Sequence, residues 1–239
     1  MAAMDLLGGV RAQLARVSAW PGATVGDAAW PATVVTVAGL AIGVLAAAAG
    51  NGFLAIGVAP AVAGVVAIAA GLVAGAAVLE RGLAAACARW LGERWAPLVT
   101  GAALLLRVVA LWSTASTAWW SALVVPAGLG RLAAVGLQRV GDTRRAVLGR
   151  SLVVGDIPTF DLGVAALVVT IIAGVALGGL GLATVAVAAV VAVVIGLALQ
   201  LGEDELAADS LAVVAVAIDL VGAVAIAAIA PAARSPFIG

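Results

Sequence analysis

Two long stretches of the chain contain no charged residue, and they constrain the fold more than any other feature of the sequence. They cover residues 28–79 and residues 162–202, which are 52 and 41 residues long. A helix needs roughly 20 consecutive apolar residues to cross a bilayer, so each stretch is long enough for two crossings. The sequence therefore predicts an all-α, polytopic transmembrane helix bundle.

Glycine, proline and charged positions divide the apolar sequence into about seven spans, within a range of six to eight. The spans are expected at about 31–50, 53–79, 96–114, 121–138, at two places within 162–202 that turn near 178–181, and at 210–230. Pro60 is expected to kink the second span, and residues 80–95 are expected to form a charged connection after it.

The spans form one predicted transmembrane domain over residues 28–231. Residues 1–27 precede it, either as an amphipathic helix at the membrane surface or as a loose polar leader. Residues 232–239 form a short tail.

The arginines predict how the spans are oriented. Nine of them lie in three segments that the seven-span topology places on the same side: residues 1–27, the connection 80–95 and the loop 139–161. Only Arg234 falls on the other side. Because Arg and Lys concentrate on the cytoplasmic side, we expect a cytoplasmic N-terminus and a multi-pass protein of the cytoplasmic membrane.

Composition excludes several classes of chemistry. All twelve basic residues are Arg, and there is no Lys or His, so Schiff-base chemistry and histidine acid–base catalysis are excluded. Cys87 is the only cysteine, which excludes an intrachain disulfide and a thiolate metal cluster. The formal net charge of zero argues against a nucleic-acid partner. Catalysis would rely on carboxylates, arginines, hydroxyls or a divalent metal.

Three charged residues fall inside predicted spans: Arg107, Arg131 and Asp219. A charge at bilayer depth costs about 2.5–3.5 kcal/mol on insertion scales, so each needs a partner or a wet cavity. Two interpretations follow. The charges form an internal Arg–Asp pair that holds helices together, or the arginines line a site for an anionic group such as a phosphate.

An acidic loop precedes the last span and contains Glu203, Asp204, Glu205 and Asp209. Residues 203–205 are best explained as a solvated acidic turn. Asp209 directly precedes the span, where it could cap the helix or serve as an oxygen ligand of a divalent ion.

Five local features, in order along the chain, resemble the cobalamin-5′-phosphate synthase family, also called adenosylcobinamide-GDP ribazoletransferases. They are PATVVTVAGLAIG at 31–43, LERGLAAACAR at 79–89, Arg107 in an apolar context, Gly130-Arg131 after Pro126, and AADSLA at 207–212. The resemblance implies a transferase of the late, nucleotide-loop step of cobalamin biosynthesis. Such an enzyme joins GDP-activated cobinamide to a ribazole unit, releases GMP and uses Mg²⁺.

The chain departs from the family at its acidic motif. Arg81, Ala85 and Ala88 stand where the resemblance places metal-binding aspartates. Asp209 and Glu80 remain as the metal ligands that the resemblance implies. An arginine at a ligand position puts a positive charge where a cation should bind.

Three functions therefore stay open. The first is a ribazoletransferase, with Arg107 and Arg131 as phosphate clamps and Asp209 as the third catalytic residue. The second is a non-catalytic paralogue that acts as a partner or binds a corrinoid. The third is an unrelated small permease or structural protein. Expected partners are membrane lipid, a corrinoid with a nucleotide-linked group, and either further copies of the chain or other membrane proteins.

Overall fold

The computed structural model describes residues 14–15, 30–141, 152–153, 156–203 and 206–230. These residues form helices and connections and include no β-strand, which confirms the predicted all-α class. The predictions for residues 1–27 and 232–239 lie outside the described residues, except at positions 14 and 15.

Eight α-helices and two short 3-10 turns make up the described bundle. The helices are α2 (Pro31–Ala55), α3 (Pro60–Ala74), α4 (Val78–Leu91), α5 (Ala96–Trp112), α6 (Trp119–Val140), α7 (Thr159–Leu177), α8 (Gly179–Gly202) and α9 (Ala208–Ile229). The turns η1 (Glu93–Trp95) and η2 (Ser116–Ala118) precede α5 and α6. Within the described residues, six helices are long and apolar enough to cross a membrane: α2, α5, α6, α7, α8 and α9, with α5 and α6 counted together with their turns.

The second predicted span is wrong as a continuous helix. In its place α3 and α4 meet at a bend of 83°, and the pair is long and apolar enough to count as one broken span. Pro60 begins α3 instead of kinking a helix, because its missing N–H needs no acceptor at the first helical position. The segment 80–95, predicted as a charged connection, is largely the helix α4.

Two alanines cause the bend between α3 and α4. Ala76 and Ala77 have φ angles of 50° and 49°, in the left-handed region that side chains with a Cβ rarely adopt. Alanine gives no signal for such a turn, so the sequence predicts one long apolar helix across this point. The break brings the first turn of α4 to the interior of the bundle, where Val78 and Leu79 are buried.

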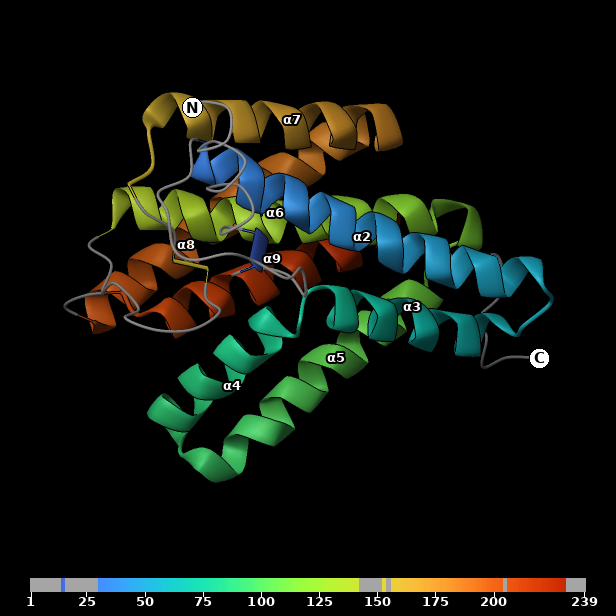
Figure 1. Ribbon diagram of the computed structural model, residues 1–239, viewed down its shortest axis with the longest axis horizontal. Helices are drawn as coiled ribbons and strands as arrows, with labels where there is room; N and C mark the ends of the chain where they lie inside the picture. Colours follow the sequence, from blue (N-terminus) through green and yellow to red (C-terminus); the bar gives the residue numbers. More distant parts are fainter. Residues whose placement is uncertain (1–13, 16–29, 142–151, 154–155, 204–205, 231–239) are drawn as a thin grey trace, which may run out of the picture.

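Close approach of α2 to α6 forms the centre of the bundle. A Cβ on Gly39 would lie 2.6 Å from the carbonyl oxygen of Ala127, and one on Gly43 would lie 2.5 Å from that of Leu123. Only glycine permits this backbone contact between helices, which is a typical way for helices to pack in lipid. Figure 1 shows α2 and α6 side by side, with α9 behind them and the α4–α5 pair leaving at a steep angle.

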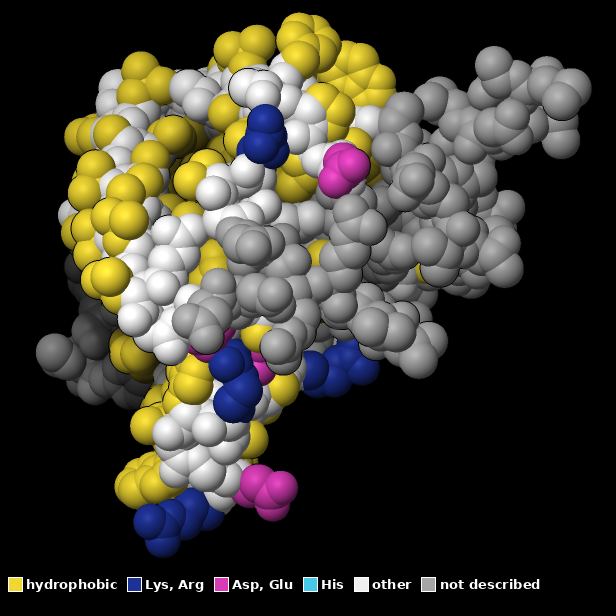
Figure 2. Space-filling model, turned by 90° about the vertical axis from the view of Figure 1, so that its left-hand side faces the viewer, with side chains coloured by type: hydrophobic (Ala, Val, Ile, Leu, Met, Phe, Trp, Pro, Cys, Tyr) yellow, Lys and Arg dark blue, Asp and Glu magenta, His cyan; other side chains and the backbone are white. Residues whose placement is uncertain are grey.

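The polar connections gather at one end of the bundle. Figure 1 shows that α2, α7 and α9 begin at this end, and that α4, α6 and α8 finish there. Figure 2 looks at this end and shows Arg, Asp and Glu side chains there, while apolar side chains cover the flanks. At the same end Asp161 of α7 accepts hydrogen bonds from the N–H groups of Ala32 and Thr33, and so caps α2.

Candidate functional site

Four charged side chains line one cavity inside the bundle. The cavity has a volume of about 70 Å³, and α2, α3, α4, α5, α6 and α9 all contribute to its wall. Glu80, Arg107, Arg131 and Asp219 are its charged residues, and the remaining wall is made of Gly, Ala, Val, Ile and Leu. The structure thus brings together the three charges that the sequence places inside spans and adds Glu80 to them.

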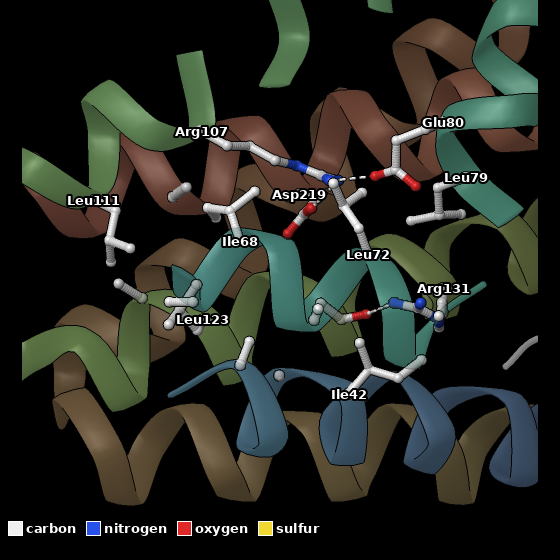
Figure 3. A pocket seen from close by; sticks show the side chains of 18 of the residues that line it. Ile42, Ile68, Leu72, Leu79, Glu80, Arg107, Leu111, Leu123, Arg131 and Asp219 are labelled. Atoms are coloured by element: carbon white, nitrogen blue, oxygen red, sulfur yellow. Dashed lines mark hydrogen bonds and ion pairs between the residues drawn. The ribbon is translucent and has the colours of Figure 1, made fainter. Parts of the chain in front are cut away.

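Arg107 of α5 is bound by two carboxylates, while its Nε has no hydrogen-bond partner. Its Nη1 donates to Oε1 of Glu80 at 2.5 Å, and its Nη2 forms an ion pair with Asp219 of α9. The three side chains are only 11–16% exposed. The internal Arg–Asp pair that the sequence allowed is therefore formed, and a second carboxylate reinforces it. Figure 3 shows Arg107 directed toward both acids.

Sequence reasoning missed the contact between Glu80 and Arg107. It placed Glu80 in a charged connection, whereas the left-handed turn at Ala76 and Ala77 rotates it into the first turn of α4 and the cavity. The available signal was weak, because a separation of 27 positions between the two charges corresponds to no helical spacing. A mid-span arginine does, however, need a partner or a wet cavity, and Glu80 is the first charge after the long apolar stretch.

Arg131 of α6 lies in the same cavity but apart from the acids, as Figure 3 shows. The residue is 4% exposed, and Nη1 donates to the backbone oxygen of Ala127 at 3.1 Å. Its Nε has no hydrogen-bond partner, and no carboxylate within the described chain forms an ion pair with it. Gly39 on α2 leaves room for the side chain, since a Cβ there would lie 2.6 Å from Cδ of Arg131.

A second charged cluster joins α4, α8 and α9 at the polar end of the bundle. Arg89 donates to both oxygens of Asp209, at 3.0 and 3.1 Å, and to Oε1 of Glu203 at 2.6 Å. Ser210 adds a hydroxyl that donates to Glu203 at 2.8 Å, and the indole N–H of Trp90 donates to the same carboxylate at 3.0 Å. Arg89 thus connects the end of α4 with the α8–α9 connection, which lies 114 to 120 positions further along the chain.

Glu203 is not part of a solvated acidic turn, as the sequence suggested; its side chain is only 10% exposed. Burial alone would raise the pKa of Glu203. The hydrogen bonds from Ser210 and Arg89 favour the carboxylate more strongly, and they hold the pKa below its ordinary value. Glu203 therefore stays ionised and bound to Arg89 at neutral pH. Residues 204–205 lie outside the described part of the chain.

The two carboxylates that the resemblance implies as magnesium ligands do not form a metal site. Glu80 is bound to Arg107, and both oxygens of Asp209 are bound to Arg89. Within the described residues, no group of three or more acidic, Cys or His side chains lies close enough to hold an ion. A divalent cation prefers several oxygen ligands free of competing cations, so these residues do not fit Mg²⁺.

The predicted site residues are thus divided between two places. Arg107 and Arg131 line the same cavity, whereas Asp209 belongs to the Arg89 cluster and does not line it. Arg89 and Ser210 are the members that the sequence did not single out. A charged residue at a helix end usually faces solvent, and only the fold shows that Arg89 meets two acids.

Comparison with family models, with curated proteins and with solved structures finds no match to this chain. Its functional assignment therefore depends on the cavity, the two charged clusters and the sequence features that they contain.

Proposed function

We propose that the protein is a multi-pass protein of the cytoplasmic membrane that is similar to cobalamin-5′-phosphate synthases and binds a phosphate-linked corrinoid. One observation carries this proposal. Three of the five sequence features of the resemblance contribute charged side chains to the same cavity: Glu80 at the start of α4, Arg107 of α5 and Arg131 of α6. The three residues lie 27 and 24 positions apart in the sequence, so their meeting at one cavity supports a shared ligand.

The orientation belongs to the same proposal. Arg89 and Arg139 lie in the last turns of α4 and α6, and Arg94 lies in η1, and we infer that this end of the bundle faces the cytoplasm. A nucleotide-activated corrinoid would then approach from the cytoplasmic side. Arginines in a water-poor cavity suit a phosphoryl group because they offer two parallel donors in a low-dielectric environment.

A second candidate function is corrinoid binding without transfer. A specific observation favours it: Glu80 and Asp209, the two acids expected to hold the metal, are each neutralised by an arginine. In such a protein the cavity would retain the anionic part of the ligand while the chemistry of phosphoryl transfer is lost.

An assay with purified protein separates the two candidates. The protein is incubated with GDP-activated cobinamide, ribazole phosphate and Mg²⁺, and corrinoid products and GMP are quantified against membranes that lack the protein. Formation of GMP and ribazole-linked corrinoid supports the transferase. Retention of the corrinoid without GMP release supports the binding protein. Absence of both product and binding would contradict the proposed function and favour a permease or structural role.

A further inference from the structure

We infer that Arg131 and the first turn of α4 form a seat for one phosphate-type oxyanion, and that Arg107 is not part of it. The inference deepens the proposed function, because it names the groups that would receive the phosphate of the ligand. The seat and the proposed function concern the same cavity, but each can be tested without the other. Free phosphate and the headgroup of a phospholipid present the same chemistry to such a seat.

The first observation is that Arg131 has no carboxylate in direct contact and that its Nε has no hydrogen-bond partner. Its guanidinium is buried, and its only hydrogen bond within the described residues goes to the neutral backbone oxygen of Ala127. The two acids of the cavity, Glu80 and Asp219, are held by Arg107 instead. A buried guanidinium without a direct anionic contact is unfavourable, because its lost hydration is not replaced. Binding of an anion would remove this cost.

The second observation is independent and concerns the N-terminus of α4, a helix of 14 residues. The left-handed Ala77 precedes it and provides no side-chain cap. Among the described residues, the N–H groups of Leu79 and Glu80 have no backbone acceptor, whereas those of Val78 and Arg81 bond to Gly75 and Ala77. Free N–H groups and the positive end of the helix dipole favour an anion at this position.

The two features lie beside the same corner of the chain. A Cβ on Gly75, which stands three residues before α4 begins, would lie 3.4 Å from Nη2 of Arg131. Gly75, Val78, Leu79 and Arg131 all line the cavity. Its volume of about 70 Å³ compares with the roughly 10–15 Å³ that one water requires. The space is therefore of the right order for a single phosphate group.

Titration with inorganic phosphate tests the seat. The full chain is purified in maltoside micelles, which contain no phosphate, and its thermal unfolding is followed by tryptophan fluorescence at constant ionic strength set with chloride. We expect phosphate to raise the unfolding temperature saturably. Arg131→Gln should weaken the apparent affinity at least about tenfold, the loss of one charge-assisted interaction. A second arm with dihexanoyl phosphatidic acid shows whether a lipid headgroup is preferred over free phosphate.

Two further variants complete the test. Arg94→Gln removes an exposed arginine outside the cavity and should leave phosphate binding unchanged. Gly75→Ala keeps every charge but adds a methyl group 3.2 Å from the carbonyl oxygen of Gly71 and 3.4 Å from Nη2 of Arg131. This methyl group narrows the seat and should weaken binding about threefold or more. If Arg131→Gln does not fold, the phosphate affinity of Gly75→Ala relative to wild type is the test of the seat.

The inference is overturned if neither phosphate nor phosphatidic acid stabilises the wild-type chain beyond chloride. It is also overturned if Arg131→Gln, or Gly75→Ala in its place, binds as tightly as wild type. Phosphate binding that depends on Arg131, together with absence of corrinoid binding, would contradict the proposed function while leaving this seat supported. Corrinoid binding that is insensitive to Arg131→Gln would support the proposed function and contradict this seat.

Discussion

Arg107 of α5 and Asp219 of α9 form an ion pair inside the bundle, and Glu80 of α4 binds the same guanidinium. One arginine thereby connects three helices that enter the fold at different points of the sequence. The four charged side chains of the cavity sum to no net charge, although Arg131 forms an ion pair with neither carboxylate.

Removal of Arg107 should be the most destabilising single change in this network. Arg107→Met leaves two buried acids without a cation, and we expect a loss of about 3–5 kcal/mol in the free energy of unfolding. Asp219→Asn should cost less, because Glu80 still holds Arg107. Thermal unfolding in detergent measures both effects. An equal or larger loss for Asp219→Asn would contradict the arrangement.

Asp161 should be a second strongly stabilising residue, although it takes no part in the cavity. Its side chain accepts hydrogen bonds from the N–H groups of Ala32, at 2.6 Å, and Thr33, at 3.1 Å, at the start of α2. Asp161→Ala would leave these buried donors unpaired at about 1–3 kcal/mol each. Thr33→Val, which removes only the hydroxyl that also bonds to Asp161, should cost about 1 kcal/mol. Similar unfolding temperatures for the two variants would argue against the cap.

The bend between α3 and α4 predicts a substitution that should stabilise the protein. Glycine at Ala77 should stabilise the protein by about 1 kcal/mol, because the left-handed conformation costs glycine nothing. The matched control is Ala69→Gly, at an exposed position within α3, which should lose about 0.5–1 kcal/mol. Loss of stability in Ala77→Gly as large as in Ala69→Gly would show that residue 77 is helical in solution.

The Arg89 cluster predicts how stability depends on pH. Because the pKa of Glu203 is lower in the folded protein than its ordinary value, its contribution is complete above about pH 5. That contribution is lost as the pH falls through the lowered pKa, when Glu203 takes up a proton and its ion pair with Arg89 ends. Unfolding temperatures recorded between about pH 3 and pH 7 should therefore fall more steeply for wild type than for Glu203→Gln. Parallel curves would contradict the pairing.

The sequence allowed the membrane class and most helices to be predicted, since charge-free runs and apolar length depend on composition alone. The turn near 178–181 was also predicted correctly, because Gly178, with φ 62°, has the conformational freedom that the connection between α7 and α8 requires. The α3–α4 bend was missed because alanine gives no local signal for a left-handed turn. The second span was consequently extended to residue 79, and α4 was interpreted as a connection.

The site was predictable only in part. Arg107, Arg131 and Asp219 were predictable as site residues, because a charge within an apolar span needs a partner or a wet cavity. Which charge compensates which depends on the three-dimensional arrangement of α4, α5, α6 and α9, and the sequence contains no spacing that encodes it. The ion pair between Asp209 and Arg89 was missed for the same reason, because it depends on how α4 and α9 pack and not on a spacing in the sequence.

The most direct test of the account is equilibrium binding of GDP-activated cobinamide to the purified protein, measured by corrinoid absorbance for wild type, Arg131→Gln and Arg94→Gln. The account predicts saturable binding by wild type and Arg94→Gln, and at least about tenfold weaker binding by Arg131→Gln. Absence of saturable binding by the wild-type protein, or equal affinities for all three proteins, would contradict it.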